Sequence, residues 1–168
     1  MRFIFTATLL FFVTLGVSAQ SKTAYINFQQ LIGLMPETKL ANDTLRLYQD
    51  ELAKDGQYLV DEYTRLVKQY DSTGANTHAS QEKLAGMEKE IRDAQTRITD
   101  YRERMEEKIA QKDQLLLKPI MEKAKKALKE VATGKGYTMV IDNSKDAVLI
   151  ASETDDLLEA VKARLGLK

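Results

Sequence analysis

The middle of the chain carries apolar side chains at an average spacing close to 3.5 residues. Leucines recur every seven residues between positions 45 and 66, and apolar residues step alternately by three and four between positions 84 and 105. This spacing is typical of helices that coil around each other with a left-handed twist, and the charged residues between suit exposed helix surface. The apolar positions are Leu45, Tyr48, Leu52, Leu59, Tyr63, Leu66 and Tyr70, followed by Leu84, Met87, Ile91, Ala94, Ile98, Tyr101 and Met105.

A short polar segment, residues 71–80, separates the two apolar patterns. It is rich in turn-forming residues, and Thr77 or Ser80 can cap the helix that follows. A connection this short predicts an antiparallel helical hairpin with its tip at residues 71–80. We expect the first helix over about residues 36–70 and the second as far as residue 133.

Several residues interrupt this regularity. Asp55 and Gly56 break the apolar stripe of the first helix, Lys108 and Lys112 break that of the second, and Pro119 predicts a bend. One interpretation is ordinary tolerance of polar residues in a coiled coil. The other is an arm that splays and bends.

The remaining segments alternate as β-strands do. Strands are predicted at Ala24–Phe28, Tyr137–Asp142 and Ala147–Ala151. Ser152 with Asp155 resembles a capping box that opens a final amphipathic helix. The apolar face of that helix comprises Leu157, Leu158, Val161 and Leu165.

These strands belong to a predicted body made of residues 20–40 and 119–168, from which a hairpin arm of residues 41–118 protrudes. The fold class is therefore α+β and mostly helical. So small a body has a marginal core and open strand edges, and we expect it to form an obligate oligomer. The residues expected in the body and its subunit interfaces are Tyr25, Ile26, Phe28, Val140, Ile141, Val148 and Leu149.

Residues 1–19 have the organisation of a secretory signal peptide. Arg2 precedes an apolar run of 14 residues, Ile4–Val17, and small residues lead to a predicted cleavage between Ala19 and Gln20. The alternative is an N-terminal membrane anchor, although the run is short for a membrane span. Because no cysteine follows, a bacterial lipoprotein anchor is excluded.

Composition excludes several kinds of chemistry. The chain has 25 basic and 25 acidic residues, one histidine and no cysteine. This neutrality argues against a mainly electrostatic nucleic-acid binder, and the single histidine argues against a Ser-His-Asp triad. The missing cysteines exclude a cysteine zinc site. His78 is interpreted as a turn residue at the hairpin tip. We predict no catalytic residue, metal or cofactor.

Two local features have alternative interpretations. Gly134-Lys135-Gly136 follows a helix and is interpreted as its end, because the other residues of a phosphate-binding loop are missing. A basic run near the root of the arm is either an exposed helix face or a contact for anionic lipids or an acidic partner. The run consists of Lys118, Lys123, Lys125, Lys126 and Lys129.

The large amphipathic side chains of the arm are candidates for binding another polypeptide. Aromatic and methionine side chains suit loose apolar contacts, although they could equally serve only to join the two helices. The candidates are Tyr48, Tyr63, Tyr70, Met87, Tyr101 and Met105.

The order of elements resembles the OmpH/Skp family of periplasmic chaperones. The resemblance covers residues 22–166 and is carried by Ala24-Tyr25-Ile26-Asn27-Phe28-Gln29-Gln30-Leu31, the charged hairpin, Tyr137–Asp142, a turn and a closing helix. It implies a jellyfish-like homotrimer, in which a β-rich body carries three helical tentacles around a cavity. It also implies an ATP-independent holdase in the periplasm of a Gram-negative bacterium. Such a holdase binds unfolded outer-membrane proteins and has no catalytic residues.

Charge separates this chain from the strongly basic members of that family. Residues 41–118 hold 13 basic and 16 acidic side chains, a net charge of −3. Hydrophobic and aromatic contacts would have to carry more of the binding, and contact with a membrane surface is disfavoured. The rival hypothesis is a structural coiled-coil protein of the envelope that docks one specific partner.

Overall fold

The computed structural model of the protein describes residues 22–76 and 79–168, so the predictions for residues 1–19, Thr77 and His78 lie outside it. The described chain divides into two compact units. The body comprises residues 22–31 and 125–168, and the arm comprises residues 32–124. In the described residues, no helix offers an apolar stretch long enough to cross a bilayer.

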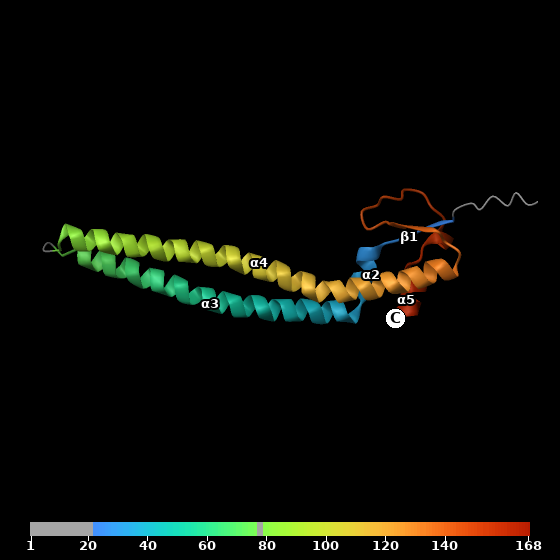
Figure 1. Cartoon of the computed structure of the whole chain (residues 1–168), viewed down its shortest axis with the longest axis horizontal. Coiled ribbons are helices and arrows are strands. Elements are labelled where there is room, and N and C mark those ends of the chain that lie inside the picture. The colour runs from blue at the N-terminus through green and yellow to red at the C-terminus, as the bar shows by residue number, and fades with distance from the viewer. Residues whose placement is uncertain (1–21, 77–78) are drawn as a thin grey trace, which may run out of the picture. The chain divides into compact units, whose positions relative to one another are not determined.

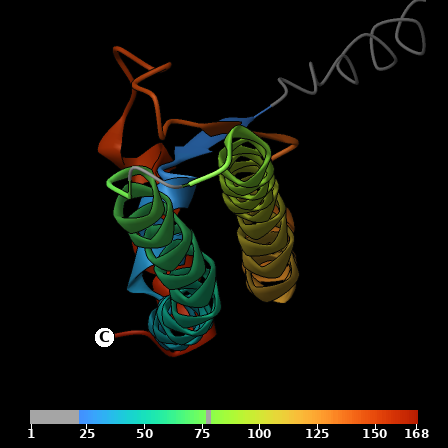
Figure 2. The ribbon, with the colours of Figure 1, turned by 90° about the vertical axis from the view of Figure 1, so that its left-hand side faces the viewer.

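The arm is an antiparallel helical hairpin, as predicted. Helices α3 (Pro36–Gly74) and α4 (Gln81–Gly134) lie side by side in both views of the ribbon (Figures 1 and 2). Pro36 occupies the first turn of α3, where its missing N–H costs no hydrogen bond. Ser80 caps α4 as predicted, because its hydroxyl accepts a 3.2 Å hydrogen bond from the Lys83 amide. Helix α4 continues through Pro119.

The apolar pattern of the sequence becomes the interface of this hairpin. Leu52, Leu66 and Ala94 of the pattern are buried, and its other residues are half-buried. This confirms the predicted pairing of the two apolar stripes. The buried residues of the arm's interface are Ala41, Leu52, Leu66, Ala94, Ile120 and Ala124.

The body is built on two parallel strands, β1 (Thr23–Ile26) and β2 (Met139–Asp142). Thr23 pairs with Met139 and Ile26 with Asp142. On its other side β1 makes a single bridge, from Tyr25 to Asp156. Helix α5 (Leu158–Leu165) closes the chain. The buried core of the body consists of Ala24, Ile26, Leu31, Ala127, Ala132, Tyr137, Leu157 and Val161.

The predicted first strand is two residues too long, because helix α2 (Phe28–Leu34) begins directly after Asn27. The Asn27 side chain accepts a 2.9 Å hydrogen bond from the Gln30 amide and so caps this helix. The carboxylate of Asp142, at the end of β2, accepts a further bond from the Phe28 amide. The end of one strand therefore helps to start the helix that follows the other.

The predicted third strand, Ala147–Ala151, is wrong for the described chain. They belong to a longer loop that starts at Asn143, directly after β2. In this loop the Asn143 side chain accepts a 2.7 Å hydrogen bond from the Val148 amide, and Asp146 has a positive φ of 52°. Because no strand of the described chain lies beside the segment, its backbone has no ladder to join. Leu149 and Ile150 are left 90% and 95% exposed.

The predicted capping box at Ser152 is also wrong. Ser152 caps only a 3-10 helix, η1 (Glu153–Asp155), and α5 starts three residues after η1 ends. The Leu157 amide donates a 3.0 Å bond to the Tyr25 carbonyl, which holds the intervening segment beside β1 and delays the helix. Asp155 instead accepts a 2.8 Å hydrogen bond from the Tyr137 hydroxyl.

Candidate functional site

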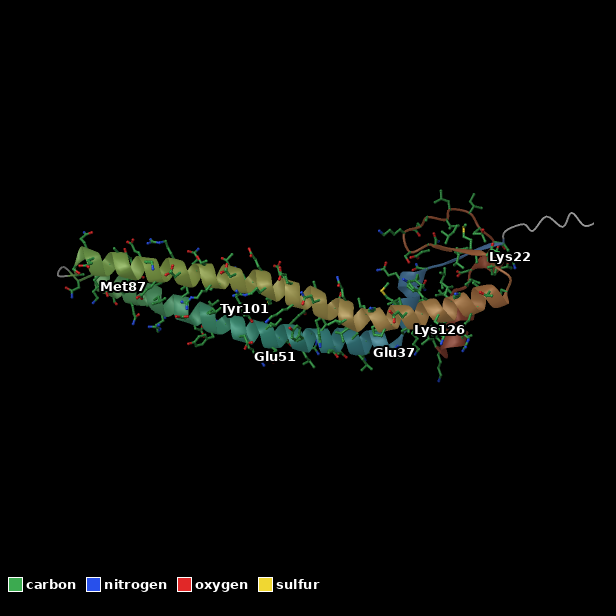
Figure 3. All side chains as sticks on the ribbon, in the orientation of Figure 1. Lys22, Glu37, Glu51, Met87, Tyr101 and Lys126 are labelled. Atoms are coloured by element: carbon green, nitrogen blue, oxygen red, sulfur yellow. The ribbon has the colours of Figure 1, made fainter. Side chains whose placement is uncertain are left out.

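The six candidate binding residues all lie at the interface of α3 and α4, and each is half-buried. Figure 3 shows Tyr101 between the two helices and Glu51 on the outer side of α3. The candidates are therefore brought into one seam, and each offers only part of its surface to a second molecule. They are Tyr48, Tyr63 and Tyr70 on α3, with Met87, Tyr101 and Met105 on α4.

Tyr101 fits into a notch that Gly56 makes in α3. A Cβ atom built on Gly56 would lie 3.0 Å from the Cε1 atom of the Tyr101 ring, closer than most such contacts. The Tyr101 hydroxyl donates a 2.7 Å hydrogen bond to the Leu52 carbonyl, one turn before Gly56. Gly56 is therefore the site where the aromatic ring reaches the backbone of the opposite helix. The interpretation of this position as a break in the seam missed that role.

A pair of alanine substitutions tests this notch. Gly86 in α4 has nothing within 4 Å of a built Cβ, so Gly86→Ala should stabilise the arm by about 0.5–1 kcal/mol through helix propensity. Gly56→Ala should stabilise the arm by less than this, or destabilise it, because the Tyr101 ring must move to make room for the new methyl group. Urea unfolding followed by circular dichroism measures both. Equal stabilisation by the two alanines would show that Tyr101 does not need the notch.

The phenol of Tyr101 responds to this environment. Burial raises the pKa of Tyr101 above its usual value of 10.0, and the charge of Asp55 raises it further. The stability that depends on the neutral phenol is complete below pH 10 and is lost as the pH rises through the higher folded-state pKa. We expect Tyr101→Phe to reduce this alkaline loss of arm stability, measured by urea unfolding between pH 9 and 11. An unchanged pH dependence in Tyr101→Phe would contradict the assignment.

The other interruptions of the pattern differ in their surroundings. Lys112 is half-buried, and its Nζ atom lies 5.6 Å from the centre of the Tyr48 ring, a distance at which cation and ring attract each other. Asp55 and Lys108 are exposed and leave the interface undisturbed. Gly56 and Lys112 thus have packing partners across the hairpin.

Polar contacts join the helices nearer the tip. The Tyr70 hydroxyl donates a 2.8 Å hydrogen bond to Glu88, which raises the pKa of Tyr70. Arg97 forms a 3.2 Å ion pair with Glu62. Such pairs near the surface contribute little to stability, and the buried Leu66 and Ala94 supply the apolar contact in the same stretch.

Two shallow apolar hollows open along the hairpin. A hollow of about 340 Å³ at the root is lined mainly by Leu40, Ala41, Leu116, Pro119 and Ile120, with the Glu37–Lys123 ion pair at its rim. A smaller one, about 180 Å³, lies beside Gly56 and is lined in part by Tyr101 and Met105. The root hollow was not predicted from the sequence. The only signal for it was the presence of the apolar residues Leu40 and Leu116, the second of them close to Pro119. Both hollows are open to solvent and can accept apolar side chains.

The residues assigned to the body and its subunit interfaces separate by burial. Ile26 is buried, whereas Ile141 is 37% exposed and Leu149 is 90% exposed. Tyr25, Phe28, Val140 and Val148 are half-buried. Burial raises the pKa of Tyr25, and the acidic side chains around it raise it further.

Comparisons with known proteins agree on one family. The model of the family described as outer membrane protein (OmpH-like) matches residues 22–165. A crystal structure from Caulobacter crescentus CB15, named as a candidate OmpH-like outer membrane chaperone, has the same fold. Its TM-score is 0.67 at 14% sequence identity, and the match covers 85% of this chain and 82% of that one. No curated protein matches the chain by sequence.

Proposed function

The chain belongs to the OmpH-like family of outer membrane proteins, and from this premise we propose that it is an ATP-independent holdase chaperone of the periplasm. Its clients are unfolded outer-membrane proteins, which it holds between helical arms and keeps from aggregating. The observation that carries the proposal is the family match over residues 22–165, which spans both body and arm.

The surface of the arm suits weak and adaptable contacts. Its hollows are shallow, and the six candidate aromatic and methionine side chains are half-buried, so each exposes only part of its surface. Each such contact contributes little, so useful affinity requires many of them to act together on one client. Binding of this kind reverses without an energy source. The contact residues in this proposal are Tyr48, Tyr63, Tyr70, Met87, Tyr101 and Met105.

Trimerisation through the body supplies several arms at once. The body exposes Met139 and Ile141 on β2, and Leu149 and Ile150 in the following loop. In the described chain β2 pairs only with β1, so its other edge is open to a strand from a second subunit. We infer that these surfaces meet in the homotrimer, and that residues 1–19 direct export and are then removed.

The absence of tryptophan from the chain allows a direct binding test. An unfolded, tryptophan-containing outer-membrane β-barrel protein is diluted from urea into purified protein (residues 20–168) without nucleotide. The client's tryptophan emission should shift to the blue and saturate near one client per trimer. A spectrum that does not change with the concentration of the protein, while its circular dichroism shows it to be folded, would contradict the proposal.

A second candidate is a structural protein of the envelope that docks one specific partner through a rigid arm. The packing of Gly56 against Tyr101 and of Lys112 against Tyr48 favours it, because both positions join the helices. The two functions differ in selectivity. A holdase binds several unrelated unfolded barrels with similar affinity, whereas a docking rod binds none of them.

A further inference from the structure

A second apolar stripe runs along the outside of the arm. Leu40, Leu47 and Tyr58 are 67%, 64% and 72% exposed. They are separated by 7 and 11 residues, two and three turns of a helix, so all three lie on one side of α3. They extend over about 27 Å at 1.5 Å per residue. We call these three residues the outer stripe.

The outer stripe flanks the interface with α4 and is mostly exposed to solvent, and only Leu40 at its root end also lines the root hollow beside α4. Leu40 is exposed, whereas its neighbour Ala41 is only 7% exposed, and successive helical residues point about 100° apart. A helix in a two-helix hairpin needs one apolar face, and its remaining positions are normally polar. Helix α3 has two apolar faces, as a helix with two helical neighbours does.

The surroundings of the outer stripe are acidic. Between residues 40 and 61 there are five acidic and two basic side chains, a net charge of −3. None of these acidic side chains forms an ion pair within the described chain. A second copy of α3 would bring like charges together, which disfavours self-association through this face. The acidic residues are Asp43, Asp50, Glu51, Asp55 and Asp61.

We propose that the outer stripe docks a basic amphipathic helix of another protein. Its apolar residues would pack on Leu40, Leu47 and Tyr58, and its lysines or arginines would pair with the acidic flanks. The regular spacing in whole helical turns favours a helix over an extended strand, because ridges of side chains can then interlock along the stripe. The proposal goes beyond the holdase function, since this partner binds folded and on the outer side of α3.

A designed peptide tests this directly. A 21-residue labelled helix with leucines at the a and d positions of its heptads and lysines beside them is titrated with the full chain (residues 20–168), and fluorescence anisotropy is followed. It should bind and gain helicity. A matched peptide with glutamates in place of the lysines, and a scrambled lysine peptide of the same composition, should each bind at least tenfold more weakly. Equal binding of the scrambled peptide would contradict helical docking.

Variants locate the binding face. The triple variant Leu40→Gln, Leu47→Gln and Tyr58→Gln retains residues that favour a helix. It should bind the lysine peptide at least tenfold more weakly than the wild-type chain does. Met121→Gln, at a residue of α4 that is 39% exposed, is the control and should leave binding unchanged. Undiminished binding to the triple variant would overturn the proposal. So would a lower sedimenting mass of the triple variant alone, because the stripe would then be covered by a second copy.

Discussion

Replacement of Leu157 by alanine is expected to lower the free energy of unfolding of the body by about 2–5 kcal/mol. Leu157 is completely buried, and its amide ties the segment before α5 to β1 through the Tyr25 carbonyl. The body buries few large side chains and has no disulfide. Truncation of Leu157 therefore removes a large share of the apolar contacts that stabilise it. Many chains would then fail to keep a folded body.

Urea unfolding with site-resolved hydrogen exchange measures this effect, because exchange reports body and arm separately. Glu159→Ala is the control in the same segment, since the Glu159 side chain is 80% exposed and forms an ion pair with Lys162 on the same helix. It should change stability by no more than about 0.5 kcal/mol. A body in Leu157→Ala that exchanges as slowly as the wild type would contradict the assigned core.

The double substitution Leu149→Asn and Ile150→Asn is expected to abolish oligomerisation. These side chains are 90% and 95% exposed in the single chain, so polar replacements should hardly change the folding stability of the subunit itself. In the proposed trimer they are buried between subunits, where unsatisfied amides are expensive. Sedimentation velocity should therefore show a monomer that retains the helical circular dichroism of the wild type.

Leu115→Asn is the matched control, because Leu115 is 70% exposed but lies on the arm. It should sediment with the mass of the wild-type protein. If the double variant keeps its oligomeric mass, the exposed loop is not the subunit interface. A holdase built on a trimeric body would then need another contact.

The helical hairpin could be predicted from sequence because its evidence is local and repeated. The steps of three and four from Leu84 to Met105 specify the buried face of α4 without reference to any other segment. The short polar connection then leaves an antiparallel pair as the simplest arrangement. The N-cap at Ser80 could also be predicted, because serine is a residue type that favours this position.

The notch at Gly56 could not be predicted, because its partner lies 45 residues away on the other helix. A glycine within a helical pattern is interpreted as destabilising the helix unless the side chain that packs against it is known. The contact between Gly56 and Tyr101 depends on the register of the two helices. The sequence pattern defines the two faces but leaves that register open.

The body was harder to predict because its elements are short and meet over long separations. The parallel pairing of β1 with β2 joins residues more than one hundred positions apart. Helix α2 was missed, since alternation from Ala24 to Phe28 hides the cap at Asn27. The apolar alternation of Ala147–Ala151 predicted a strand, but a strand requires a neighbour, and the described chain offers none to this segment.

The most direct test of the central claim is suppression of client aggregation. A urea-unfolded outer-membrane β-barrel protein is diluted into nucleotide-free buffer, and light scattering is followed against increasing concentrations of the protein. The holdase account predicts that scattering falls and that suppression is complete near one trimer per client. Undiminished scattering in the presence of folded, oligomeric protein would contradict that account and favour a structural protein of the envelope.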